Sequence, residues 1–183
     1  MSKKQNSLFL IILTALLIVM NIILERVFSY FVPDSNISLS FIPVTFAATF
    51  LPTPYTIAVG AIGDILGALL FPVGAYFPGF TITNIFVACI SSLFLYKNAS
   101  LPRIVISVFI NKTIGTLLLN SYWLYFFFLS SKTKPESFFL FLGGRAFQFT
   151  LMLIIEIVIN TLLFHNKSKI RKVFQKNLNK YIH

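Results

Sequence analysis

Charged residues are scarce in this chain, which has 15 lysines and arginines and only 5 aspartates and glutamates among 183 residues. Hydrophobic residues make up 57% of the sequence, and the mean hydropathy is +0.85. These values exclude a water-soluble globular domain. The few charges cluster between long apolar runs, and about 20 apolar residues suffice to cross the hydrocarbon of a bilayer. The sequence therefore predicts a single integral membrane domain.

Residues that carry redox, metal or nucleophilic chemistry are almost absent. Cys89 is the single cysteine and lies in an apolar run, so it predicts no internal disulfide. The two histidines, His165 and His183, have no cysteine or carboxylate at ligand spacing. No Ser–His–Asp set and no phosphate-binding loop ending in Lys-Ser or Lys-Thr is present. We therefore expect no metal, no cofactor, no catalysis and no ATP hydrolysis by this chain alone.

Six apolar segments are present, at residues 8–32, 39–51, 55–71, 79–96, 103–128 and 138–164. They predict an all-α membrane protein, a six-helix transmembrane bundle formed by residues 1–183 as one domain, with a basic tail at 165–183. The second segment is short and has prolines at both ends, so we expect a tilted or re-entrant helix that its neighbours bury.

Basic residues indicate how the bundle is oriented. Lysines and arginines cluster at both termini and at Lys97 and Arg103, whereas Lys132 and Lys134 in another loop are offset by acidic residues. The positive-inside rule then places both termini in the cytoplasm. This arrangement also explains the net charge of +10 without a nucleic-acid partner.

The stretch from residue 63 to residue 83, GDILGALLFPVGAYFPGFTIT, is punctuated by prolines and glycines that must stop one helix and start the next. Its turn should face outward. Gly63 and Gly67 predict a close approach between helices. Tyr76, Phe77 and Phe80 fit either an interfacial aromatic belt or the lid of a pocket.

Ionisable residues inside the apolar segments fall into two predicted depths. Asp64, Lys112 and Glu156 share an inner level, where Lys112 should form an ion pair with Asp64 or Glu156. A proton or cation relay through the three is the alternative. Arg26 and Arg145 share an outer level. They could bind a ligand or extend to lipid phosphates.

Neutral hydrogen-bonding side chains accompany the outer arginines. Asn84, Asn120, Gln148 and Trp123 lie at similar predicted depths. Arginine binds carboxylates through two parallel hydrogen bonds, and aromatic rings stack on flat ligands. The set predicts a site for a ligand that carries carboxylates and a flat, hydrogen-bonding ring system.

Several motifs together resemble the substrate-binding components of energy-coupling factor vitamin transporters, and the folate family in particular. The long block at 63–83 is the most specific of them. LERVFSY at 24–30, SFIP at 40–43, LLLNSYWL at 117–124, and Arg145 followed by Glu156 extend the resemblance over nearly the whole chain. Two positions differ from the family pattern. Val19 is bulkier than the small residue common there, and Gln148 replaces a common lysine.

The resemblance implies a bacterial cell-membrane protein that captures a vitamin from outside and docks on a transmembrane coupling protein with two cytoplasmic ATPases. Folate is the expected ligand. A thiamine precursor, pantothenate, riboflavin, a self-sufficient ion-coupled carrier and a membrane enzyme using Asp64 or Glu156 are the alternatives. The predicted ligand-binding residues are Arg26, Tyr76, Phe77, Phe80, Thr81, Asn84, Asn120, Trp123, Arg145 and Gln148.

Overall fold

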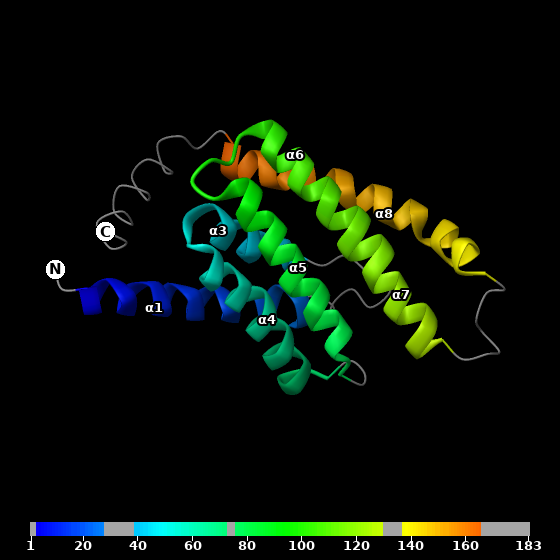
Figure 1. The fold of residues 1–183 in the computed structure, drawn as a ribbon, viewed down its shortest axis with the longest axis horizontal. Coiled ribbons are helices and arrows are strands. Elements are labelled where there is room, and N and C mark those ends of the chain that lie inside the picture. Colours follow the sequence, from blue (N-terminus) through cyan, green and yellow to red (C-terminus); the bar gives the residue numbers. More distant parts are fainter. Residues whose placement is uncertain (1–2, 28–38, 73–75, 130–136, 166–183) are drawn as a thin grey trace.

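The structure is a computed structural model that describes residues 3–27, 39–72, 76–129 and 137–165. The described residues form helices joined by short connections, without a strand. In chain order the elements are α1 (Lys3–Ile22), η1 (Ile23–Val27), α3 (Phe41–Phe50), α4 (Thr53–Leu70), α5 (Pro78–Leu95), α6 (Leu101–Ile110), η2 (Asn111–Asn120), α7 (Ser121–Trp123), η3 (Leu124–Phe128), α8 (Phe138–Asn160) and η4 (Thr161–His165). The η segments have wider, π-type turns and continue the neighbouring helices (Figure 1).

Prolines set several helix boundaries. Pro54, Pro78 and Pro102 occupy the first or second position of α4, α5 and α6, where a missing N–H costs nothing because that group has no partner in the helix. α4 ends at Leu70, before the Phe71–Pro72 pair, because a residue that precedes proline avoids the α conformation. The predicted stop and restart between residues 63 and 83 is therefore confirmed.

Five helices are long and apolar enough to cross a membrane: Ser7–Arg26, Thr53–Leu70, Pro78–Leu95, Leu101–Phe128 and Phe138–Leu163. They correspond to five of the six predicted segments. The remaining segment forms α3, which is short as predicted. At about 1.5 Å per residue, its ten residues span roughly half of the hydrocarbon.

α3 is the most deeply buried helix of the bundle. Eight of its residues are buried, and it packs against α1, α4 and α5. The carbonyl of Thr49 at its end accepts a hydrogen bond of 3.2 Å from the backbone N–H of Lys97, just after α5. α3 therefore occupies the half of the bundle that contains the end of α5. Its burial explains how so short a helix is stable among membrane spans.

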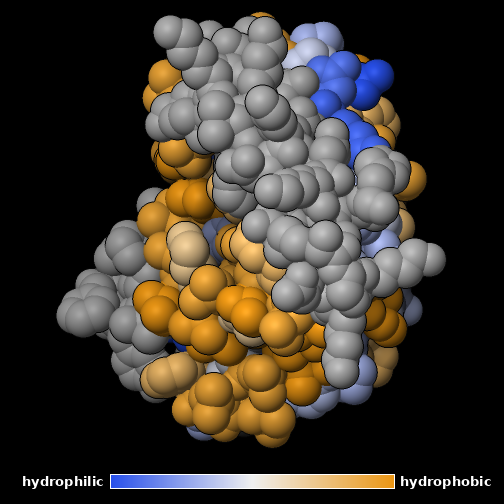
Figure 2. Space-filling model, turned by 90° about the vertical axis from the view of Figure 1, so that its left-hand side faces the viewer, coloured by the Kyte–Doolittle hydropathy of each residue, from blue (hydrophilic) through white to orange (hydrophobic). Residues whose placement is uncertain are grey.

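Both ends of the described chain lie at one end of the molecule. Figure 1 shows the start of α1 at the far left and the end of η4 in the upper part of the same left half. Figure 2 looks at this end, where hydrophilic residues gather at one upper corner and hydrophobic residues cover most of the lower half. The exposed Lys97 lies between α5 and α6, and the exposed Arg103 lies in the first turn of α6, at the end that the positive-inside rule places in the cytoplasm. The predicted tail at 166–183 lies outside the described residues.

The hydrophobic core fills the cytoplasmic half of the bundle. It centres on α3 and includes Leu51, Val59, Ala88, Leu95 and Ile104, all at most 1% exposed. Glycine allows the closest helix contacts. A Cβ at Gly63 would meet Nδ2 of Asn21 at 2.5 Å, and one at Gly67 would meet Nε of Arg26 at 3.3 Å. The predicted close approach at Gly63 and Gly67 is confirmed and joins α1 to α4.

Candidate functional site

A cavity of about 370 Å³ lies on the outer side of this core, between α1, α3, α4, α5, η2 and α8. Its wall is rich in hydrogen-bonding groups, although the surrounding helices are apolar. The polar residues in the wall are Asn21, Glu25, Arg26, Ser40, Thr83, Asn84, Asn111, Lys112, Thr116, Asn120, Arg145, Gln148 and Glu156. A polar cavity inside a membrane bundle is costly unless it has a ligand or water to hold, so it is the first candidate for the binding site.

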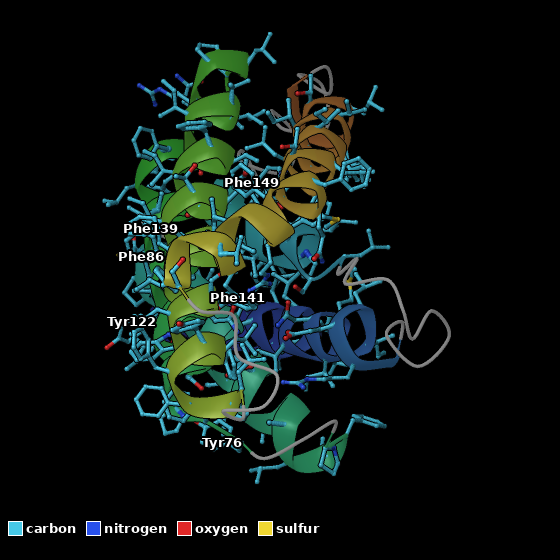
Figure 3. The ribbon with its side chains drawn as sticks, turned by 90° about the vertical axis from the view of Figure 1, so that its right-hand side faces the viewer. Tyr76, Phe86, Tyr122, Phe139, Phe141 and Phe149 are labelled. Carbon is cyan, nitrogen blue, oxygen red and sulfur yellow. The ribbon has the colours of Figure 1, made fainter. Side chains whose placement is uncertain are left out.

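Helix periodicity brings the α8 residues of the wall onto one face. Arg145, Gln148, Met152 and Glu156 follow each other at intervals of three or four residues, and Phe149 lies beside them. From Arg145 to Glu156 the helix rises about 16 Å. Figure 3 looks onto the outer end of the molecule and shows Phe141 and Phe149 toward its middle, whereas Tyr122 and Phe139 lie at its edge. α8 thus gives the cavity one long polar wall.

The residues of the cavity wall that face α8 come from η2. Lys112, Thr116 and Asn120 are four residues apart and line the cavity, as does Asn111. Wide π-type turns are frequent at functional sites, because they change the direction in which neighbouring side chains point. Gly115, on the same segment, lets η2 approach α5, since a Cβ there would lie 2.9 Å from Val87.

Arg145 presents a positive charge that no carboxylate of the described residues neutralises. Its Nη1 donates a hydrogen bond of 2.9 Å to Oγ of Ser121, and its guanidinium carbon lies 5.7 Å from the centre of the Phe141 ring. Among the described residues, no carboxylate lies within 4 Å of it. An unneutralised guanidinium on a cavity wall is suited to an anionic ligand.

Arg26, by contrast, is already paired. Its Nη2 lies 3.3 Å from Oδ1 of Asp64 and 3.9 Å from Oε1 of Glu25. The hydroxyl of Thr81 donates a 2.6 Å hydrogen bond to Oδ2 of Asp64, and the hydroxyls of Tyr76 and Thr81 are 2.9 Å apart. The prediction that Asp64 shares a level with Lys112 and Glu156 is therefore wrong. The prediction estimated the depth of each charge by counting residues from the end of its apolar segment. Such a count ignores differences in the height and tilt of α1 and α4.

Lys112 pairs with Glu156. Its Nζ lies 2.6 Å from Oε2 of Glu156, and the two side chains are 13% and 5% exposed. Glu156 was one of the two predicted partners, so the ion pair is confirmed and the pairing with Asp64 is not. Because Asp64 belongs to a separate pair with Arg26, the three groups do not form the continuous relay that an ion-coupled carrier would use.

Four buried polar atoms of cavity-wall residues accept or donate no hydrogen bond within the described part of the chain. They are Oδ1 of Asn21, Nε of Arg26, Oδ1 of Asn111 and Oδ1 of Asn120. Buried polar atoms in native proteins nearly always have a partner. Three of the four are amide oxygens of residues that line the cavity, so the wall has hydrogen-bonding capacity that the described residues leave unused.

The predicted site residues divide into two groups. Arg26, Asn84, Asn120, Arg145 and Gln148 come together in the cavity wall. The other predicted residues lie outside that wall and are Tyr76, Phe77, Phe80, Thr81 and Trp123. Their role in covering a ligand stays a prediction.

Three of the residues outside the wall form an aromatic cluster beside the cavity. The ring of Phe77 lies 5.5 Å from Trp123 and 6.0 Å from Phe80, and Nε1 of Trp123 donates a 3.2 Å hydrogen bond to the hydroxyl of Thr83. A Cβ at Gly79 would come within 2.7 Å of Trp123, so glycine is needed for this packing. Through Thr83 the cluster contacts the cavity wall itself.

The sequence prediction missed Asn21, Lys112, Phe149 and Glu156 as wall residues. For Glu156 and Phe149 a signal was present, because both share a helix face with Arg145. For Asn21 and Lys112 no local signal exists. Their position depends on which helices are neighbours.

The sequence model of the family described as "ECF transporter, substrate-specific component" matches residues 9–165. The chain belongs to this family. A substrate-specific component binds the substrate of a transporter, so membership agrees with the prediction of a binding subunit and not an enzyme. It also agrees with a multi-pass protein of the bacterial cell membrane.

Named relatives and a solved structure are similar to this substrate-specific component. It is 36% identical over 123 residues to a folate transporter, FolT, of Clostridium novyi, covering 67% of this chain and 70% of that protein. It is 28% identical over 158 residues to FolT of Leuconostoc mesenteroides subsp. mesenteroides, covering 85% and 84%. A crystal structure of FolT bound with folic acid has a similar fold, with a TM-score of 0.73, 24% identity, and coverage of 84% and 90%.

Proposed function

We propose that this substrate-specific component binds folate in the cavity between η2 and α8. The observation that carries the proposal is Arg145, a guanidinium that no described carboxylate neutralises, in a wall that also contains amide oxygens without a partner among the described residues. Folate combines carboxylates with a flat ring system rich in hydrogen-bonding groups. The two similar proteins named as folate transporters support this choice over the other vitamins.

In this proposal the predicted site residues have distinct roles. Arg145 binds a ligand carboxylate, while Asn84, Asn120 and Gln148 form hydrogen bonds from the wall. Arg26 contributes mainly through its Nε, which has no hydrogen-bond partner among the described residues, because Asp64 and Glu25 lie close to its Nη2. Tyr76, Phe77, Phe80, Thr81 and Trp123 cover the ligand from the adjoining loop and aromatic cluster.

Direct titration of the purified protein with folic acid tests the proposal. We expect saturable binding of one folic acid per chain, with no comparable binding of thiamine, pantothenate or riboflavin. Trp123 is the single tryptophan and contacts the wall through Thr83, so its fluorescence should change on binding. Preferential binding of another vitamin would overturn the assignment of folate while leaving the family unchanged.

We also propose that transport requires a partner module, a transmembrane coupling protein with two cytoplasmic ATPases. The chain has no phosphate-binding loop, and α1 has an exposed apolar face, including Ala15 and Val19, through which it can contact another membrane protein. ATP-dependent uptake of labelled folic acid into liposomes should require all the components. Uptake by this chain alone would contradict the proposal and favour a self-sufficient carrier.

A further inference from the structure

The two arginines of the cavity wall are held by different kinds of group. Nη2 of Arg26 lies 3.3 Å from the carboxylate of Asp64, which offsets its charge. Nη1 of Arg145 instead donates a 2.9 Å hydrogen bond to Oγ of Ser121, a neutral hydroxyl. A hydroxyl lone pair fixes the direction of a guanidinium and leaves its positive charge intact. Arg145 is therefore oriented by a group that does not neutralise it.

Ser121 is a fixed and enclosed acceptor. It is 0% exposed, so bulk water does not compete for its hydrogen bond with Arg145. It belongs to α7, a three-residue segment between the π-type segments η2 and η3. The same segment is anchored to α5, because Nε1 of Trp123 donates a 3.2 Å hydrogen bond to the hydroxyl of Thr83. Ser121 does not line the cavity itself, so it can act on a ligand only through Arg145.

A second neutral group contacts the same guanidinium. The guanidinium carbon of Arg145 lies 5.7 Å from the centre of the Phe141 ring, which comes one turn earlier on α8. The ring of Phe141 lies 5.7 Å from that of Tyr125 on η3, so contact with another helix holds it in place. An aromatic ring attracts a cation without cancelling its formal charge. Figure 3 shows Phe141 toward the middle of the outer end, beside the start of the cavity wall on α8.

We propose that Ser121 is a positioning residue for ligand binding, which holds the guanidinium of Arg145 in the orientation that a ligand carboxylate requires. The inference rests on the proposed function, in which Arg145 binds a carboxylate of folate. An arginine side chain has several rotatable bonds, and it loses their freedom when it binds a ligand. The hydrogen bond to Ser121 reduces this loss, because the guanidinium is ordered before the ligand arrives. The remaining N–H groups, which form a rigid fork, stay available to a carboxylate.

Ser121→Ala removes the acceptor and should weaken the binding of folic acid about three- to tenfold, the factor associated with one hydrogen bond. A double-mutant cycle with Arg145→Ala separates positioning from a general effect on the fold. In the Arg145→Ala background, Ser121→Ala should cause no further loss of affinity, because the side chain on which Ser121 acts is absent. Titration calorimetry with folic acid measures the affinity of each protein, and thermal unfolding shows that each is folded.

Ser121→Asp tests whether the orienting group must be neutral. The new carboxylate can still accept a hydrogen bond from Arg145, but it pairs with the guanidinium as Asp64 pairs with Arg26. We expect folic acid to bind about ten- to a hundredfold more weakly, a loss similar to that of Arg145→Ala although the guanidinium is retained. If this variant does not fold, the double-mutant cycle decides the question alone.

Ser92→Ala is the matched control. Ser92 on α5 is also 0% exposed, its hydroxyl lies 2.8 Å from that of Thr53, and it does not line the cavity. Loss of this buried hydroxyl should lower the melting temperature and leave the affinity for folic acid unchanged.

Wild-type affinity in folded Ser121→Ala or Ser121→Asp would overturn the inference. An undiminished effect of Ser121→Ala in the Arg145→Ala background would overturn it too, because Ser121 would then act independently of Arg145. If the wild-type protein binds no folic acid, the proposed function fails instead. The two failures are therefore distinguishable.

Discussion

The guanidinium of Arg26 and the carboxylate of Asp64 lie 3.3 Å apart and tie the outer end of α1 to α4. Asp64 also accepts a hydrogen bond from the hydroxyl of Thr81 on α5, so one buried carboxylate connects three helices. This ion pair gives the two arginines of the cavity wall different roles. Arg26 is held by the fold, and Arg145 is available to a ligand.

Asp64→Asn should destabilise the protein, because it leaves the part-buried charge of Arg26 without its main partner. Loss of one member of a buried pair typically costs about 3 kcal/mol. Thermal unfolding in detergent should show a lower melting temperature. The double change of Arg26→Met with Asp64→Leu should recover part of the lost melting temperature. Equal melting temperatures of the wild type and Asp64→Asn would contradict the assigned ion pair between Arg26 and Asp64.

Arg145→Ala should weaken folate binding about ten- to a hundredfold, because it removes a charged hydrogen-bond donor from the cavity. The change should have little effect on folding, since the guanidinium forms no ion pair with described residues. Titration calorimetry measures the first effect and thermal unfolding the second. Arg103→Ala, at the exposed start of α6, is the control and should bind folate normally.

Gly63→Ala should destabilise the contact between α1 and α4, because the new Cβ would lie 2.5 Å from Nδ2 of Asn21. Overpacking of this kind costs about 1–3 kcal/mol. Gly143→Ala is the matched control on α8, where a Cβ meets nothing within 4 Å. That change should be neutral or stabilising by up to about 1 kcal/mol, because alanine favours helix. Similar melting temperatures for both variants would contradict the close approach.

Ala15→Trp should block assembly with the proposed energising module while leaving folate binding intact. Ala15 lies on the exposed side of α1, so a large side chain there meets a partner and not the core. The neighbouring Thr14 does not share this face, because it is buried and donates a 2.7 Å hydrogen bond to the carbonyl of Leu10. Co-purification and binding are measured on the same variant. Leu140→Trp, exposed at the outer end of α8, should assemble normally.

Loss of folate binding together with assembly would show that Ala15 packs within the fold. Undiminished assembly of Ala15→Trp would place the docking face on another helix.

Local properties of the sequence determined the number and type of the elements. Apolar length predicted the five long spans and the short second helix, because crossing hydrocarbon requires a fixed helix length regardless of neighbours. Prolines predicted where α4 ends and α5 begins, since their effect on the backbone is local. The alignment of Arg145 and Gln148 on one face of α8 likewise followed from the sequence, because helix periodicity alone places residues three apart on the same face.

Only the tertiary structure decided which charges are partners and which side chains share the cavity. Asp64 pairs with Arg26 and not with Lys112, because the relative height and tilt of α1 and α4 depend on the glycine contacts between them. Lys112 and Glu156 enter the cavity wall because η2 packs against α8. Such contacts join residues far apart in the chain, and their geometry depends on the packing of all the helices together.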